Sequence, residues 1–143
     1  MFTFEHSVFI RRPVQEVRDF VSEPTNHPKF GPQTSNGWTS DGPLDVGSTT
    51  RGVSRFLGRS IETNSEITSW EPPHSYSSRS MNDSIASKGQ RTFETKDNGT
   101  LLTFSGQAEI GGFIKMAEGL VGKQLDKQIT TDLGGLKLML EAN

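Results

Sequence analysis

Residues 112–141 read GFIKMAEGLVGKQLDKQITTDLGGLKLMLE, the longest stretch of the chain with the pattern of an amphipathic helix. As one continuous helix it would be about 45 Å long, enough to cross a small domain. A sector of its helical wheel roughly 140° wide holds mostly apolar residues. They are Phe113, Ala117, Leu120, Val121, Gln124, Leu125 and Gln128. The pattern predicts a helix that buries one face against the rest of the chain.

The apolar stripe of this helix changes face toward its C-terminal end. It continues there through Ile129, Leu133, Leu136 and Leu140. Glycine costs about 1 kcal/mol relative to alanine inside a helix, so a pair of glycines there needs a structural reason. We therefore expect Gly134 and Gly135 to mark either a bend of the helix or a close contact with a neighbouring element.

Composition narrows the class of protein. We expect one domain over residues 1–143, large enough for a core without disulfides, and the chain has no cysteine to form them or a thiolate metal site. The 15 Lys and Arg are scattered among 17 Asp and Glu, for a net charge of -2, so neither nucleic acid nor an anionic membrane is an expected partner. The start of the chain lacks the features of a signal peptide, and no apolar run approaches the ~18 residues of a membrane span. We expect a soluble cytoplasmic protein without stable membrane insertion, and the oligomeric state stays open.

The first third of the chain predicts one strand and two short helical segments. Alternation over residues 2–10 is typical of a half-buried strand, with His6 as the one polar residue on its inward face. Pro13 suits the first position of a helix that ends near Ser22. A helical turn near His27 and a short strand over residues 34–38 follow.

The middle of the chain predicts an antiparallel meander. We expect a strand at about 48–57, a returning strand that runs to Trp70, and further strands at 75–81, 91–96 and 100–110, with a turn over 82–87. Gly58 and the run Asp97-Asn98-Gly99 supply hairpin turns. On the last strand Gly106 and Ala108 are small and leave room above the sheet. A sheet with one apolar face and no crossover helix needs a cover, which predicts an α+β fold in which a curved sheet grips the C-terminal helix.

Motifs spread along the whole chain carry a family resemblance. They are RPVQEV at 12–17, NHPKF at 26–30, GPLDVG at 42–47, ITSWEPP at 67–73 and NGT at 98–100, followed by the long final helix. In this order and spacing the chain resembles the START/Bet v 1-like (SRPBCC) superfamily, in particular its polyketide cyclase/dehydrase-like proteins. The resemblance implies a helix-grip fold with a curved seven-stranded antiparallel sheet, and a cavity for an apolar or amphipathic small molecule. It implies no single activity, since members include carriers, cyclases, receptors and lipid or quinone chaperones.

Strand and helix periodicity select the residues expected to border such a cavity. The predicted ligand-binding set is His6, Phe104, Ala108, Leu120, Gln124 and Gln128. His6 is either a hydrogen-bond partner or general base in the cavity, or a structural histidine satisfied by a neighbouring backbone group. Gln124 and Gln128 either donate to a polar group of the ligand or lie where the helix leaves the core.

A second set is expected to form an apolar rim at the cavity mouth. It consists of Phe56, Leu57, Ile85 and Phe113, each of which ordinary core packing would also explain. Of the strand arginines, Arg51, Arg55 or Arg79 could reach inward to a carboxylate ligand, although outward arginines are commoner on a sheet. His27 and His74 lack further ligands at metal spacing, so no metal site is expected.

No local motif identifies the chain as an enzyme. The chain has no phosphate loop, no nucleophile elbow and no closely spaced carboxylate pair, and no cofactor is expected. The leading hypothesis is a protein that binds a small apolar or amphipathic molecule between sheet and helix. One alternative is a polyketide cyclase, aromatase or dehydratase that uses polar cavity residues. The other is a protein-interaction module with a vestigial cavity.

Overall fold

A computed structural model of the protein describes residues 2–31, 33–56, 58–82, 85–111 and 118–142. These residues form seven strands, two α-helices and one 3-10 helix. In chain order the elements are β1 (Phe2–Ile10), α1 (Val14–Ser22), η1 (Pro24–Lys29), β2 (Gln33–Trp38), β3 (Thr49–Phe56), β4 (Arg59–Glu71), β5 (Ser75–Met81), β6 (Ile85–Lys96), β7 (Gly99–Ile110) and α2 (Glu118–Glu141).

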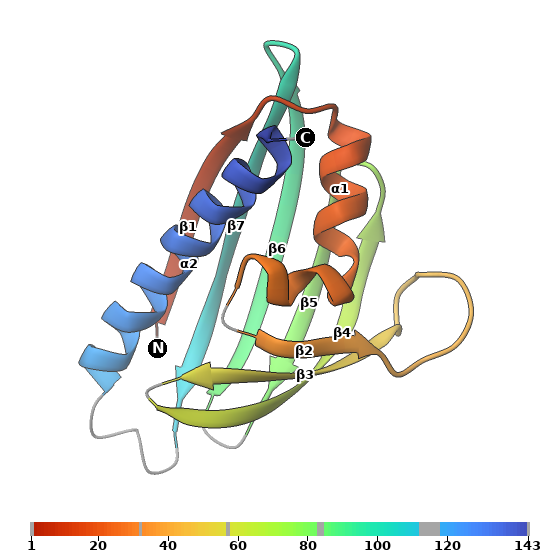
Figure 1. Ribbon diagram of the computed structural model, residues 1–143. Coiled ribbons are helices and arrows are strands. Elements are labelled where there is room, and N and C mark those ends of the chain that lie inside the picture. The colour runs from red at the N-terminus through yellow and green to blue at the C-terminus, as the bar shows by residue number, and fades with distance from the viewer. Residues whose placement is uncertain (1, 32, 57, 83–84, 112–117, 143) are drawn as a thin grey trace.

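The seven strands form one antiparallel sheet in the order β1-β7-β6-β5-β4-β3-β2. All three helical segments lie on the same face of this sheet, with α2 along β1 and α1 over the middle strands (Figure 1). The sheet curves around them, and this inner face carries the core. The predicted α+β helix-grip fold is confirmed.

Most predicted elements occur within one or two residues of their expected bounds, but the expected turn over residues 82–87 is wrong. β6 already begins at Ile85, which pairs with Ile110, and Ala86 pairs with Met81. Residues 86–89 read Ala-Ser-Lys-Gly, which has low intrinsic strand preference. Pairing with two neighbouring strands imposes the extended conformation that this local sequence does not favour.

The turn between β6 and β7 follows its sequence signature. Asp97 and Asn98 have φ values of 48° and 63°, and the flanking Lys96 pairs with Gly99. Two central residues with positive φ match the right-handed twist of an antiparallel pair, and Asn and Asp tolerate this conformation best after glycine. The turn fixes the register of β6 against β7, the two strands that carry the centre of the inner face.

Helix α2 buries the C-terminal stripe that its sequence predicts, but its N-terminal half is rotated so that the buried face there is narrower than the helical wheel predicts. Val121, Leu133, Leu136 and Leu140 are buried, whereas Leu120 is 65% exposed. Two contacts of the last turn fix this rotation at the C-terminal end. The Lys137 ammonium donates to the Phe9 carbonyl oxygen, and the Arg11 amide donates to Glu141 at 2.9 Å.

The glycine pair of α2 has no close partner. A methyl group at Gly134 would meet no atom within 4 Å, and one at Gly135 would lie 3.8 Å from the Phe30 carbonyl oxygen, an ordinary van der Waals distance. The expected close contact at this pair is therefore not found. Gly122 lies closer to the sheet, since a methyl group there would be 3.3 Å from the ring of Phe2.

The solid core lies toward one end of the sheet. Its buried members include Ile10 at the end of β1, Val17 and Val21 of α1, and Leu136 and Leu140 of α2. These residues gather where α1 and the C-terminal end of α2 meet the end of β1, near the C-terminus in Figure 1. Toward the opposite end, α2 and the sheet enclose space that the core does not fill.

Candidate functional site

Two adjoining chambers lie between the inner face of the sheet and α2. The chamber nearer the core, here called the inner chamber, has a volume of about 190 Å³, and the lower chamber, toward the start of α2, has about 250 Å³. Both are lined by Ser54, Arg91, Phe104 and Ile129, which therefore mark their junction. Together the two chambers form one cavity, hereafter the cavity.

The inner chamber is mostly apolar. Its apolar walls come from α1, β7, α2 and the loop after η1, and include Val21, Phe30, Leu102, Ile129, Leu133 and Leu136. Its polar groups are few, and those with titratable or charged side chains are His27, Arg91 and Asp132. Apolar walls with a few convergent polar groups are typical of small-molecule sites.

A glycine pair at the centre of the sheet lets two aromatic rings lie flat against it. Gly89 pairs with Gly106, and the ring of Phe4 lies over Gly106 while that of Phe104 lies over Gly89. The two rings meet edge to face with centroids 4.8 Å apart. The space above Gly106 is thus filled by Phe4 rather than left open as the sequence predicts, while Ala108 lines the lower chamber.

Arg91 lies at the junction of the two chambers and on the central strands of the inner face. Its cross-strand neighbours are Phe104 on β7 and Tyr76 on β5. The guanidinium carbon is 4.2 Å from the centroid of the Phe104 ring and 5.3 Å from that of Tyr76. Contacts of this kind hold a cation against aromatic faces and fix its position.

Asp132 brings a carboxyl group into the inner chamber from α2. Gln128, one turn earlier, donates to its Oδ1 at 2.7 Å. Burial raises the pKa of Asp132 from 3.8 to about 6, even though the Gln128 hydrogen bond acts in the opposite direction. The cavity therefore holds a carboxyl group that changes charge near neutral pH.

His27 is held by hydrogen bonds on both ring nitrogens. Nε2 lies 2.8 Å from the Val21 carbonyl oxygen, which fixes the proton on Nε2, and Nδ1 accepts from the Asn36 amide at 3.0 Å. The Val21 carbonyl is one of those that the end of α1 leaves unpaired, and Tyr76 also donates to it. Burial and then the Arg91 charge lower the pKa of His27 to about 4. It is a neutral structural side chain that closes one wall of the chamber.

The structure places His6 outside the cavity lining. Its Nε2 lies 2.7 Å from Asp126 Oδ1 on α2, and the two side chains are 27% and 50% exposed. This is the structural alternative for His6, although the partner is a side chain rather than backbone. His6 thus joins the middle of β1 to the N-terminal half of α2.

Of the other predicted ligand-binding residues, Phe104, Ala108 and Gln128 line the lower chamber together. Leu120 and Gln124 do not join them, because α2 is rotated so that both lie on its exposed side. The rotation brings Leu125, Gln128 and Ile129 over the sheet instead. Whether any of these residues contacts a ligand stays a prediction.

Only part of the predicted mouth can be placed. Ile85 lines the lower chamber at the start of β6. Leu57 and Phe113 lie outside the described residues, as does the side chain of Phe56. The lower chamber is also lined by Arg55, one of the three strand arginines expected as candidates.

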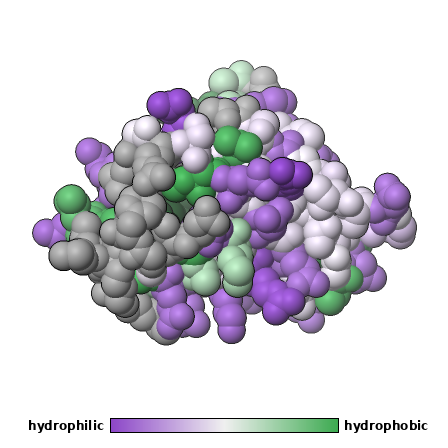
Figure 2. All heavy atoms as spheres, turned by 90° about the horizontal axis from the view of Figure 1, so that it is seen from below, coloured by the Kyte–Doolittle hydropathy of each residue, from purple (hydrophilic) through white to green (hydrophobic). Residues whose placement is uncertain are grey.

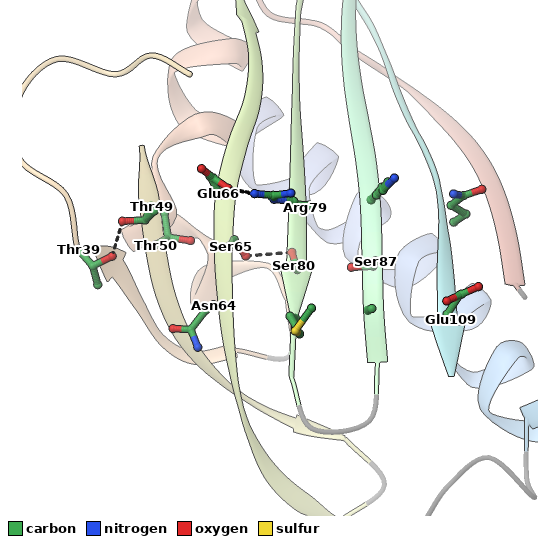
Figure 3. Close-up of a pocket in the computed structure, with 14 residues that line it drawn as sticks. Thr39, Thr49, Thr50, Asn64, Ser65, Glu66, Arg79, Ser80, Ser87 and Glu109 are labelled. Atoms are coloured by element: carbon green, nitrogen blue, oxygen red, sulfur yellow. Dashed lines mark hydrogen bonds and ion pairs between the residues drawn. The ribbon is translucent and has the colours of Figure 1, made fainter. Parts of the chain in front are cut away.

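The outer face of the sheet carries an open polar groove of about 820 Å³ (Figure 3). It lies on the face away from α2, and several of its charged and hydroxyl groups are paired with one another. Arg79 pairs with Glu66, and the hydroxyl groups of Thr39 and Thr49 lie 2.7 Å apart. Arg51, on the same face, pairs with Glu62 at 2.8 Å. Two of the three candidate arginines therefore lie on the outer face and form ion pairs there.

Metal-ligating side chains do not cluster in the described part of the chain. No three His, Asp or Glu side chains of the described residues gather as a metal site would need. No helix among them combines the length and apolarity needed to cross a membrane.

Sequence reasoning missed Arg91 and Asp132 as members of the site. A signal for Arg91 exists, since alternation along β6 puts it on the same face as the buried Phe93. For Asp132 the signal is its position between Ile129 and Leu136 on the rotated stripe of the helix. In both cases the local pattern allows an inward charged side chain, but only the neighbouring elements determine it.

The pKa of Asp132 leads to a testable pH dependence. Because the folded protein holds this proton more tightly than the unfolded chain, stability rises as the pH falls from about 6 toward 4. Asp132→Asn removes this contribution. The free energy of unfolding of the variant minus that of wild type is therefore expected to be about 1 kcal/mol larger at pH 8 than at pH 4, a value that allows for the partial exposure of Asp132. Urea unfolding of both proteins at the two pH values measures this difference. The same difference between variant and wild type at pH 4 and pH 8 would contradict the raised pKa of Asp132.

Comparisons with known proteins agree with this architecture. The sequence profile of the family described as "Polyketide cyclase / dehydrase and lipid transport" matches residues 1–141. A search of proteins with curated functions found no match.

Solved structures share the fold at low sequence identity. TTHA0849 from Thermus thermophilus superposes with a TM-score of 0.83 at 17% identity, covering 98% of this chain and 97% of that one. The ZhuI aromatase/cyclase from Streptomyces sp. R1128 has a TM-score of 0.78 at 14% identity, covering 97% and 93%. Ara h 8.0201 has a TM-score of 0.74 at 14% identity, covering 99% and 98%. Identities this low establish the shared fold alone.

Proposed function

The chain belongs to the polyketide cyclase/dehydrase and lipid transport family, and on this basis we propose that it binds a small apolar or amphipathic molecule in the cavity. The observation that carries the proposal is the pair of joined chambers between α2 and the sheet. Their walls are supplied by strands at the centre of the sheet and by the rotated face of α2, so the space is part of the architecture.

The chemistry of the walls favours a mainly apolar ligand. Burying apolar surface contributes roughly 25 cal/mol per Å². A ligand covered by Leu102, Ile129, Leu133 and Leu136 therefore gains affinity from the apolar surface that it buries. Polar groups at the junction then fix its orientation. This division of roles fits the lipid-transport part of the family description as well as the cyclase part.

The end of the molecule at which α2 begins provides a route into the cavity. Seen from this end, apolar atoms reach the surface near the middle of the face, and polar residues border them on one side (Figure 2). Phe2, Ile85 and Leu125 line the lower chamber on this side. An apolar molecule entering here would meet apolar contacts before it reaches the charged groups at the junction.

Filling the junction should abolish binding without unfolding the protein. Ser54 lines both chambers and is small, so Ser54→Phe places a ring where the ligand would lie. We expect the affinity for an apolar fluorescent probe, 1-anilinonaphthalene-8-sulfonate, to fall by about tenfold or more, which corresponds to about 1.4 kcal/mol. Fluorescence titration measures it.

The chain offers a matched control for this variant. Ser77 on β5 faces the outer side of the sheet, so Ser77→Phe adds the same ring to the opposite face. The probe should bind this variant as it binds wild type, and both variants should give the wild-type circular dichroism spectrum. If Ser77→Phe weakened binding as much as Ser54→Phe, or if neither did, the cavity would not be the binding site.

One observation favours a second candidate function, an enzyme of the cyclase or dehydratase type. Asp132 can hold a proton near neutral pH inside the cavity, as a general acid must. It would protonate a hydroxyl group of the cyclised polyketide-like substrate, which leaves as water while the adjacent carbon loses a proton to solvent and a C=C bond forms. The similarity to an aromatase/cyclase fits this function at the level of the fold.

The enzymatic candidate has its own test. A linear poly-β-ketone thioester is incubated with wild type and with Asp132→Asn, and loss of water is followed by mass spectrometry. An enzyme that uses Asp132 should accelerate dehydration over the spontaneous rate, more so as the pH falls toward 6, and the variant should lose this acceleration. Equal rates with both proteins would leave ligand binding as the function.

A further inference from the structure

We propose that the ligand of the cavity is an organic acid with a compact apolar body, and that its carboxylate binds the guanidinium of Arg91. This inference rests on the proposed binding function and specifies the ligand class. Arg91 borders both chambers, so a carboxylate at the junction can be reached from either.

The position of Arg91 is fixed before any ligand arrives. Its guanidinium lies over the Phe104 ring at 4.2 Å and near the Tyr76 ring at 5.3 Å. Tyr76 is itself buried and donates to the Val21 carbonyl oxygen, while Phe104 packs against Phe4. A guanidinium held between fixed rings loses little freedom when it forms a bidentate pair with a carboxylate.

The guanidinium has no anionic partner within the described part of the protein. Among the described residues no carboxylate lies within ion-pair distance of Arg91, and no hydrogen bond from its nitrogens to the protein is found. Arg51 and Arg79 on the outer face show the opposite arrangement, since each is paired with a glutamate. An inward-facing cation between aromatic walls costs free energy unless water or a ligand satisfies it.

The neighbouring titratable groups do not pair with this charge. His27 is neutral, with its proton directed at the Val21 carbonyl, and the Arg91 charge contributes to its low pKa. Asp132 is engaged by Gln128, and its pKa is raised by burial rather than lowered by a nearby cation. The charged groups facing the inner chamber are thus a guanidinium that pairs with no described carboxylate and a carboxyl group, ionised above about pH 6, that binds Gln128 instead.

The inner chamber sets the shape of the rest of the ligand. Leu102, Leu133 and Leu136 surround a volume of about 190 Å³ next to Arg91. A fused two-ring system attached directly to a carboxylate suits this geometry, because the rings would lie among the leucines while the carboxylate stays at the junction. A longer apolar tail would extend into the lower chamber instead.

A matched pair of probes tests the proposal on the wild-type protein. 2-Naphthoate carries the carboxylate, and 2-naphthamide has nearly the same shape without the charge. By isothermal titration calorimetry at pH 7.5, we expect 2-naphthoate to bind roughly 10-fold to 100-fold more tightly, the range for a hydrogen-bonded ion pair.

Arg91→Met keeps an apolar side chain against Phe104 and removes the charge. We expect 2-naphthoate to bind this variant no better than 2-naphthamide, whose own affinity stays within about threefold of wild type, the scatter of an ordinary substitution. Arg91→Lys should retain part of the preference, because it keeps the charge without the planar fork. Arg51→Met, which removes an exposed arginine paired with Glu62 on the outer face, should leave the preference unchanged.

The outcomes separate this inference from the proposed function. Equal affinity of wild type for the two probes would overturn the role of Arg91 while leaving the cavity as a binding site. Loss of the preference in Arg91→Lys and Arg51→Met alike would do the same. Binding of neither probe would overturn both. If Arg91→Met does not fold, the affinities of the two probes for wild type and for Arg91→Lys still test the role of Arg91.

Discussion

Replacing Gly106 with alanine is expected to lower the free energy of unfolding by about 3 kcal/mol, the upper part of the range for overpacked interiors. The added methyl group would overlap the Lys88 carbonyl oxygen and lie 2.9 Å from both Gly89 Cα and the Phe4 ring. Two of these atoms belong to the backbone of β6, so they cannot withdraw without breaking its pairing with β7. The variant should also disturb the Phe4 and Phe104 rings that floor the cavity.

Gly134→Ala is the matched control for this substitution. A methyl group there meets nothing within 4 Å, and alanine is the better helix former, so a gain of about 0.5–1 kcal/mol is expected. Thermal and urea unfolding measure both variants. The assignment of close packing to Gly106 would be refuted if the two alanine variants changed stability by the same amount and in the same direction.

The second large effect is an acid sensitivity that comes from His27. Its pKa is about 4 in the folded protein and 6.5 in the unfolded chain, so the unfolded chain takes up the proton first as the pH falls. The stability that neutral His27 contributes is therefore complete above about pH 6.5 and is lost progressively toward pH 4. The shift corresponds to about 3 kcal/mol.

Comparison with His27→Gln isolates this contribution. Glutamine can replace one of the two hydrogen bonds but does not titrate, so the variant should be less stable at pH 7. The difference between the two proteins should shrink by up to about 3 kcal/mol between pH 7 and pH 4. Measuring the difference removes the opposing contribution of Asp132, which both proteins share. A difference independent of pH would mean that folding leaves the pKa of His27 unchanged.

The fold was predictable because its signals are local. Alternation over residues 2–10, Pro13 at the start of the first helix, and Asp97-Asn98 each determine the conformation of the residues that carry them. The start of β6 was not predictable in this way. Residues 86–89 become a strand only because β5 and β7 lie on either side.

The cavity was predictable in its place but not in its residues. Helical spacing predicts the apolar sector of α2 to within about one residue, which is an angular step of about 100°. A step of this size separates the buried Val121 from the exposed Leu120. Contacts at the far end of the helix, through Lys137 and Glu141, set its rotation. The same limit explains why Gln128 lines the cavity while Gln124 is exposed.

Methyl NMR of labelled protein titrated with 2-naphthoate would show whether the cavity binds an apolar small molecule. We expect nuclear Overhauser effects from the naphthalene protons to the methyl groups of Leu102, Ile129 and Leu133, which line the inner chamber. Leu101, on the outer face of β7, and the exposed Leu138 should show none. Contacts confined to those two residues, or no contacts at saturating 2-naphthoate, would contradict binding in the cavity.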